Sequence, residues 1–304
     1  MTWQRFAVLA TLVAAAVTAI GCAQQTPAGP RIYVFENGAI RGLDPALFNF
    51  TREELKEVDF VNASYLIVHP RGTLMFDSGA IADAHLKDDG SEVTEGVVTA
   101  SKPLLPQLAA AGYAPRDVTY FALSHFHSDH TANANEFASA TWIVQKAERD
   151  FMFADSPQGI IQPASYAALR NAKTEILDNE DFDVFGDGSV VVMATPGHTP
   201  GHQVVAVKLA NRGTVVLGGD LYHYPEERTT GRIPTFEFNA EQSRASRARD
   251  AVSAPATSIR FSTTRCRRMA ASRLRYGLNP DGRCGSPARN AACAAVAMAA
   301  GTPK

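Results

Sequence analysis

The sequence has little cysteine, and its long central part has none. Its 304 residues include 4 cysteines: Cys22, Cys266, Cys284 and Cys293. A disulfide framework and a zinc site built on thiolates are therefore both excluded between residues 23 and 265. That region must be stabilised by apolar burial, and any metal site in it must use nitrogen and oxygen ligands.

The sequence also lacks an excess of charge of either sign. It has 29 Lys and Arg residues against 31 Asp and Glu residues, a formal net charge of -2. A polyanion-binding protein needs a concentration of positive charge, so we predict no nucleic-acid partner. Repeats and low-complexity tracts are not evident before residue 250. Oligomeric state is not predicted by this sequence.

The N-terminal residues have the pattern of a bacterial targeting segment. Arg5 precedes an apolar run from Phe6 to Ile20, which has the length of a signal-peptide core and is shorter than a membrane span. The residues up to Cys22 resemble a lipoprotein cleavage site, so we expect a signal peptide of lipoprotein type in 1–22 and a tether in 23–30. Cleavage nearby would instead give ordinary secretion. Either way we expect export, to the periplasm or beyond, or membrane attachment through lipidated Cys22.

The densest group of metal-ligand side chains follows a short apolar segment. Residues 118–123 are β-branched, aromatic and apolar, which predicts a buried strand. The next residues, Ser124-His125-Phe126-His127-Ser128-Asp129-His130, carry three imidazoles and one carboxylate. Alternate side chains of an extended segment point the same way, and these groups bind divalent ions such as zinc. Solvated or internally satisfied histidines would not gather so densely, so a metal site is predicted after a strand.

Two later segments offer further ligands. Residues 189–194 predict a strand, and Thr195-Pro196-Gly197-His198-Thr199-Pro200-Gly201-His202 follows, with its backbone fixed by proline and glycine. One of these two histidines is a predicted ligand. Another predicted strand, from residue 213, ends at Gly218-Gly219-Asp220, where the glycines let backbone approach an ion. Asp220 is therefore a candidate bridging carboxylate, although on its own it would be interpreted as a loop cap.

Together these motifs resemble the metallo-β-lactamase superfamily, in their order and in their spacing. The opening strand from Ile32 and the hairpin that ends at Asp77-Ser78-Gly79 are most similar to the N-acyl-homoserine lactonase group. The resemblance covers roughly residues 31–249. It implies an α/β fold, the αββα sandwich of the superfamily, in a single hydrolase domain over 31–250, a length that can bury one core.

The resemblance also implies a role for each ligand residue. Two zinc ions would bridge a hydroxide that attacks a lactone or ester carbonyl. The first ion would be held by His125, His127 and His198, and the second by Asp129 and His130, with Asp220 bridging both. His202 would lie outside the ligand set, while Asp129 and Asp220 are the expected catalytic carboxylates. The group has a tyrosine where this chain has His223, so we predict a catalytic role for a flanking residue, Tyr222, with Tyr224 as the alternative.

The substrate is less well defined than the reaction. A small lactone or ester is expected, with residues 47–50 and 151–153 either lining an acyl pocket or belonging to the core. A β-lactam, an aryl ester or an organophosphate would present a similar electrophile to the same site. A mononuclear iron oxidoreductase of the superfamily is a further alternative.

The residues after Asp250 change in character. Arginines stand among Ala, Ser, Thr, Pro and Gly, and no helical or strand period persists over 251–304. The lactonase group supplies a last histidine from near its C-terminus, whereas the last one here is His223. We hypothesise a frameshift near residues 248–258 and expect the closing elements of the fold to be missing or replaced. An arginine-rich nucleic-acid arm is disfavoured because interleaved aromatic residues are lacking, and a metal-binding protein that has lost activity is the alternative if the tail is genuine.

Overall fold

The computed structural model describes residues 28–253, 259–261 and 296–297. The predicted signal peptide, most of the predicted tether and most of the tail lie outside these residues. Within the described part, no helix combines the length and the apolar character that crossing a membrane requires.

The larger of two sheets is mixed and has the strand order β4-β5-β1-β2-β3-β6-β7-β8, with β14 also beside β1. Neighbours from β4 to β3 are antiparallel, whereas β3, β6, β7 and β8 run parallel. The predicted hairpin is formed by β2 and β3. The strands are β1 (Arg31–Ile40), β2 (Phe60–His69), β3 (Gly72–Phe76), β4 (Val93–Glu95), β5 (Val98–Ala100), β6 (Tyr120–Ala122), β7 (Thr141–Gln145), β8 (Thr174–Leu177) and β14 (Val296–Ala297).

The smaller sheet has the order β13-β12-β11-β10-β9. Its strands from β9 to β12 are antiparallel neighbours, and β13 lies parallel to β12. Valines dominate β10 to β12, as expected of strands that are buried between layers. The bounds are β9 (Phe182–Asp183), β10 (Val190–Ala194), β11 (Gln203–Leu209), β12 (Gly213–Leu217) and β13 (Ile259–Phe261).

Part of the predicted tail belongs to these sheets, which differs from the sequence-based expectation. Ile259 pairs with Val215 and Phe261 with Leu217, so β13 closes the edge of the smaller sheet. A β-branched and an aromatic residue favour this strand, but three residues are too few to show a period. Residues 259–261, which lie beyond the domain boundary expected at residue 250, thus pair with the smaller sheet.

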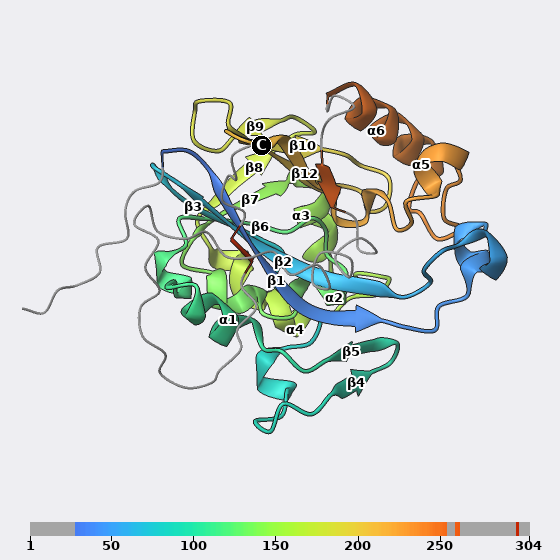
Figure 1. Cartoon of the computed structure of the whole chain (residues 1–304). Coiled ribbons are helices and arrows are strands. Elements are labelled where there is room, and N and C mark those ends of the chain that lie inside the picture. Colours follow the sequence, from blue (N-terminus) through green and yellow to red (C-terminus); the bar gives the residue numbers. More distant parts are fainter. Residues whose placement is uncertain (1–27, 254–258, 262–295, 298–304) are drawn as a thin grey trace, which may run out of the picture.

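The two sheets pack face to face, with helices on both outer sides. Apolar side chains from both sheets form one shared core, to which Phe76, Val192 and Leu217 belong. A second core joins the outer face of the larger sheet to α1, α3 and α4, and α6 lies on the other side of the molecule (Figure 1). The α-helices are α1 (Leu104–Ala110), α2 (Ser128–Thr131), α3 (Lys146–Met152), α4 (Pro163–Tyr166), α5 (Glu227–Thr230) and α6 (Ala240–Ser253), and the 3-10 helices are η1 (Pro45–Phe48), η2 (Arg52–Glu54), η3 (Asp83–His85), η4 (Pro115–Asp117), η5 (Ala134–Phe137), η6 (Ala167–Asn171) and η7 (Gly219–Leu221).

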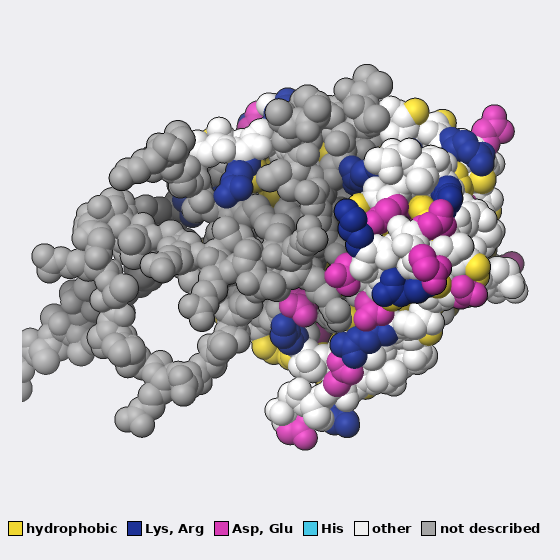
Figure 2. Space-filling model, turned by 45° about the vertical axis from the view of Figure 1, so that its right-hand side comes forward, with side chains coloured by type: hydrophobic (Ala, Val, Ile, Leu, Met, Phe, Trp, Pro, Cys, Tyr) yellow, Lys and Arg dark blue, Asp and Glu magenta, His cyan; other side chains and the backbone are white. Residues whose placement is uncertain are grey.

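Charged side chains are mixed over the surface. On the described part of the face in Figure 2, basic and acidic groups are interspersed and do not gather by sign. Some form exposed ion pairs, such as Arg232 with Glu54 and Lys102 with Glu36. Such pairs contribute little to stability, so the fold depends mainly on its apolar cores.

Strand ends from both sheets meet at one edge of the sandwich. The loop after β6 is tied to the segment after β3, because Asp77 donates its backbone N–H to Ala122. The same loop is tied to the smaller sheet, since Gln203 donates its backbone N–H to Ser124. The segments that follow β6, β10 and β12 therefore converge, and these segments carry the predicted metal ligands.

Candidate metal centre

The loop after β6 presents its side chains through a change of backbone conformation at His127. This residue is extended, with φ -60° and ψ 146°, and it is the N-cap of α2. His125 and His127 therefore precede the helix, while Asp129 and His130 lie in its first turn. The change from strand-like to helical backbone lets four side chains of one short segment face a common volume.

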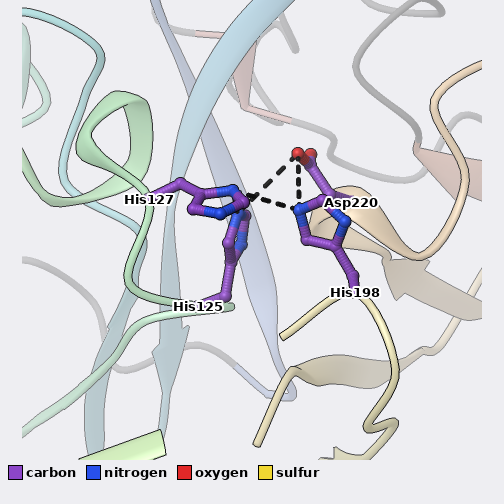
Figure 3. A group of neighbouring side chains, drawn as sticks. All are labelled: His125, His127, His198 and Asp220. Carbon is purple, nitrogen blue, oxygen red and sulfur yellow. Dashed lines mark hydrogen bonds and ion pairs between the residues drawn. The ribbon is translucent and has the colours of Figure 1, made fainter. Parts of the chain in front are cut away.

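The first cluster consists of three imidazoles and one carboxylate (Figure 3). Nδ1 of His127 lies 2.9 Å from Nε2 of His125 and 3.1 Å from Nε2 of His198. Oδ2 of Asp220 lies 3.8 Å from Nε2 of His125 and 3.5 Å from Nε2 of His198. Four potential ligand atoms from three segments of the chain thus surround one point.

A second cluster shares Asp220 with the first. It contains Asp129, His130 and Asp220. Nε2 of His130 is 3.3 Å from Oδ2 of Asp129 and 3.4 Å from Oδ1 of Asp220. Asp220 therefore offers Oδ2 to the first cluster and Oδ1 to the second, which is the arrangement required of a bridging carboxylate.

Two imidazoles of the first cluster are held neutral. Burial and the neighbouring histidines lower the pKa of His125 well below its usual value. Burial, with His198 next, lowers the pKa of His127 to about 3. A neutral ring keeps a lone pair on one nitrogen, which is the form that binds a metal ion.

The second cluster has the opposite electrostatics. Burial alone would lower the pKa of His130, but the carboxylates of Asp129, Asp77 and Asp220 outweigh it and raise that pKa well above the usual value. Burial would likewise raise the pKa of Asp220, yet His130 and His223 hold it well below its usual range. This pocket of carboxylates therefore demands a positive charge, which a divalent cation would also supply.

The residues present fit a divalent metal. Nε2 of His130 and Oδ1 of Asp220 are buried and make no hydrogen bond within the described part of the chain. Buried polar atoms without a hydrogen bond are costly and usually have a functional reason. Together with a donor set of imidazoles and carboxylates, they fit an ion of the zinc type.

Asp77 supports the second cluster from behind. Its Oδ1 accepts the backbone N–H of Ser124 at 2.6 Å, and its Oδ2 accepts Nδ1–H of His130 at 3.0 Å. Its φ of 61° is unusual for a residue other than glycine. Sequence reasoning used Asp77 only as part of a family-like turn and missed this role.

His202 lies outside both clusters, as expected from the resemblance. It is fully buried, and burial lowers its pKa to about 3. Its Nε2 accepts the backbone N–H of Asp220 at 3.2 Å, while Nδ1 donates to Oγ1 of Thr195 at 2.9 Å. His202 therefore holds the backbone of the bridging residue in place, and His198 is the histidine of this turn that faces the cluster.

Glu148, on α3, connects the two loops that carry the histidines. Its Oε1 accepts the backbone N–H of Phe126 at 2.8 Å, and its Oε2 accepts that of Gly201 at 2.8 Å. The hydroxyl of Thr199 donates to the same carboxylate. Nothing in the sequence marked Glu148, because a glutamate at the start of a helix is normally a solvated residue.

The predicted tyrosine does not lie at the cluster. Tyr222 packs among apolar residues on the outer face of the smaller sheet, and its hydroxyl donates to the carbonyl of Arg247 at 3.4 Å. Tyr224 is fully buried and donates to the carbonyl of Val58 at 3.1 Å. Between them, His223 has its Nε2 3.4 Å from Oδ2 of Asp220. His223 is therefore the residue of this segment that lies at the site.

The proposed acyl-pocket residues are divided between surface and core. Phe48 and Phe50 are buried in a small aromatic cluster with Phe60 and Tyr224, and Met152 is buried under the larger sheet. Leu47 remains 40% exposed. The buried residues therefore belong to the core, as one of the two interpretations held.

Comparisons with known proteins agree with this geometry. A family model of the metallo-beta-lactamase superfamily matches residues 58–259. The N-acyl homoserine lactonase AttM of Rhizobium radiobacter is 31% identical over 180 residues, which cover 55% of this chain and 68% of AttM. An N-acyl homoserine lactonase of a Bacillus species is 28% identical over 206 residues, which cover 66% of this chain and 78% of that protein.

Solved structures show the same fold. A Bacillus thuringiensis AiiA mutant with N-decanoyl-L-homoserine bound at its active site has a TM-score of 0.64 and 22% identity, over 80% of this chain and 97% of that one. AidC, a dizinc quorum-quenching lactonase, has a TM-score of 0.56 and 20% identity, over 77% of this chain and 87% of AidC. The expected αββα architecture is confirmed. The chain belongs to the metallo-β-lactamase superfamily and, within it, to the N-acyl-homoserine lactonase-like group of metallo-hydrolases.

Proposed function

We propose that this protein opens the ring of N-acyl-homoserine lactones or closely related lactones and esters, using two zinc ions. The observation that carries this proposal is the sharing of Asp220 between two ligand clusters, with one carboxylate oxygen facing each. The names of the related lactonases support the substrate class.

The ligand residues divide the work of holding the metals. His125, His127 and His198 would hold one ion, Asp129 and His130 the other, and Asp220 both. Such ions, when bound, supply a water of lowered pKa and polarise a carbonyl group. Asp129 and Asp220 would help to position that water, and the neutral rings of His125 and His127 leave nitrogen lone pairs free to bind the first ion.

We propose that His223 has the catalytic role that the sequence analysis predicted for Tyr222. Its ring packs against His198, Phe48 and Phe236, with centroid distances of 5.2, 5.0 and 5.5 Å. This packing keeps Nε2 on the cluster side, beside Asp220. We assign to this nitrogen the hydrogen bond to the oxygen that leaves when the lactone opens.

Exposed apolar side chains near the clusters support a substrate with an acyl chain. The ring of Phe236, which is 41% exposed, lies 6.0 Å from that of His198, and Phe238, two residues further along the same loop, is 60% exposed. Ile160 is 63% exposed, and its carbonyl accepts the backbone N–H of Ser128 beside His127. Exposed apolar side chains commonly mark a binding surface, where an apolar ligand covers them.

Metal analysis joined to a hydrolysis assay tests this proposal. The full chain should bind zinc and open N-hexanoyl-homoserine lactone, and a panel with a β-lactam, an aryl ester and an organophosphate should be turned over more slowly. One bound iron with no hydrolysis would favour the oxidoreductase alternative. Bound zinc with no turnover of any substrate would favour a metal-binding protein that has lost activity.

We also propose that the protein is exported. The support is the signal-like pattern of residues 1–22 with Cys22 at a lipoprotein-type site. Fractionation of a bacterium that expresses the full gene should find the protein outside the cytoplasm, and Cys22→Ala should release it from the membrane fraction. A wild-type protein that stays in the cytoplasm would contradict the proposal.

A further inference from the structure

A buried carboxylate lies behind His198, on the side away from the metal cluster. Glu237 belongs to the loop between α5 and α6, and its side chain is only 2% exposed. Its Oε1 lies 3.1 Å from Nδ1 of His198. The two neighbours of Glu237, Phe236 and Phe238, are exposed, so the direction of Glu237 into the protein is a specific feature of this loop.

We propose that Glu237 is a positioning residue that fixes the ring orientation and the tautomer of His198 for metal binding. In the structure Nε2 of His198 faces the cluster, 3.1 Å from Nδ1 of His127 and 3.5 Å from Oδ2 of Asp220. Nδ1 must then carry the proton, and Glu237 accepts it in a hydrogen bond. A carboxylate in this position orients a histidine ligand and increases its basicity toward the metal.

Further hydrogen bonds hold the loop that carries Glu237 in place. Ser243, on α6, donates its hydroxyl to Oε2 of Glu237. The backbone N–H of Phe238 donates to the carbonyl of His198 at 3.3 Å, and that of Asn239 donates to the carbonyl of Gly197 at 2.8 Å. The loop and the His198 turn are thus joined by two backbone hydrogen bonds from the residues that directly follow Glu237.

Gly197 is part of the same arrangement. A Cβ atom at this position would lie 2.3 Å from the backbone nitrogen of Ser243, and φ is +140°. Only glycine allows the turn to come this close to α6. The close approach lets Ser243 contact Glu237 and Glu237 contact His198, so a chain of side-chain contacts runs from α6 to the cluster.

Each cluster then has one histidine supported by a buried carboxylate. Asp77 accepts Nδ1–H of His130 in the second cluster, and Glu237 accepts Nδ1–H of His198 in the first. Asp77 directly follows β3 of the larger sheet, whereas Glu237 lies in the loop before α6. The inference concerns metal retention, so it does not depend on which substrate the protein opens.

The tautomer of His198 in the wild-type protein is the first test. Long-range proton–nitrogen NMR spectra of the zinc-bound full chain should show His198 with a proton on Nδ1 and with Nε2 bound to metal. Assignment uses the spectrum of His198→Gln, from which the signals of this ring disappear. A proton on Nε2, or an Nδ1 that binds the metal, would overturn the proposal without any need for a Glu237 variant.

The second test is zinc affinity, measured by competition with a chromophoric chelator. Glu237→Ala should weaken the tighter zinc site by about 10- to 100-fold. Glu237→Gln should cause a smaller loss, because its amide oxygen can still accept the Nδ1–H. The matched control is Glu241→Gln, an exposed acid on the neighbouring helix, which should leave the affinity unchanged. An affinity of the Glu237→Ala protein within twofold of wild type would refute the assignment, whether or not the protein hydrolyses lactones.

Discussion

Among single residues, Asp220 takes part in several interactions of the site at once. Its two oxygens face two different clusters, its backbone N–H is held by His202, and Nε2 of His223 lies 3.4 Å from Oδ2. The glycine before it, Gly219, leaves room for this crowding, since a Cβ there would lie 2.5 Å from Cβ of Ser124. We therefore expect both the bridging of the metals and the orientation of His223 to depend on the side chain of Asp220.

Asp220→Ala should remove the bridge between the two ions. We expect the hydrolysis rate to fall by about 100-fold or more, because at least 2.7 kcal/mol of stabilisation in the transition state would be lost. Steady-state kinetics with zinc in excess would measure this. Unchanged turnover would mean that Asp220 only caps its loop, the simpler interpretation of this residue.

His127→Ala should affect the first cluster while leaving the second intact. The ring of His127 is partly exposed and contacts both other imidazoles of the cluster, so its loss removes a ligand with little loss of core packing. Zinc content should fall and hydrolysis should be abolished, while circular dichroism should be unchanged. Retained lactone opening in this variant would argue against the dinuclear assignment.

At the scale of elements, the site is held together by α3 and α6. Glu148 joins the loop after β6 to the turn after β10, and the start of α6 holds that turn through Ser243. The strands on either side were predictable, because runs such as Val190–Ala194 are apolar and β-branched and end at turn residues. The supporting acids Glu148 and Glu237 could not be predicted, because they are distant in sequence from the ligands and lie in segments with no distinctive pattern.

Glu148 should make stability depend on pH. Burial raises its pKa from 4.5 to about 7 despite three hydrogen-bond donors that favour the charged form. The folded state then keeps a proton that the unfolded state loses above 4.5, so this contribution to stability is complete below that pH and disappears as pH rises through about 7. Relative to Glu148→Gln, the free energy of unfolding of the chelated wild type should fall by on the order of 3 kcal/mol between about pH 4 and about pH 8. Parallel pH profiles for the two proteins in urea unfolding would contradict this.

Gly197→Ala should separate the His198 turn from α6. The added methyl group would overlap the backbone of Ser243, so we expect a loss of about 1–3 kcal/mol in the free energy of unfolding and weaker zinc binding. Gly90→Ala is the matched control, because Gly90 also has a positive φ, of +72°, but open space around it. If the two variants unfold alike, backbone strain alone explains the effect and the close approach has no importance of its own.

In the molecule as a whole, the two ligand clusters of the sandwich are not equivalent. Sequence patterns predicted the strands that carry ligands, because these are strongly apolar, whereas the hairpin was expected from the family resemblance and the single domain from the resemblance and the chain length. They missed β13, whose three residues lie where the periodicity has ended. Among described residues the second cluster has three candidate ligands, against four in the first, and the chain has no histidine after His223.

This asymmetry predicts two zinc-binding events of different strength. The first ion should bind tightly to the three imidazoles and Asp220, and the second should bind more weakly because it has fewer protein ligands. Isothermal titration of the chelated full chain with zinc should show two separate steps. Two equal sites would indicate that a further ligand completes the second cluster, and resequencing the codons for residues 244–266 would show whether a frameshift removed a histidine.

We infer that the chain is a zinc-dependent lactone hydrolase. The most direct test of this inference is the rate of N-hexanoyl-homoserine lactone opening, followed by proton release, before and after zinc is returned to the chelated full chain. We predict no catalysed opening without zinc and recovery of catalysis as the second, weaker site fills. Lactone opening that persists without metal, or no lactone opening when both sites are occupied, would show that the protein is not a zinc-dependent lactone hydrolase.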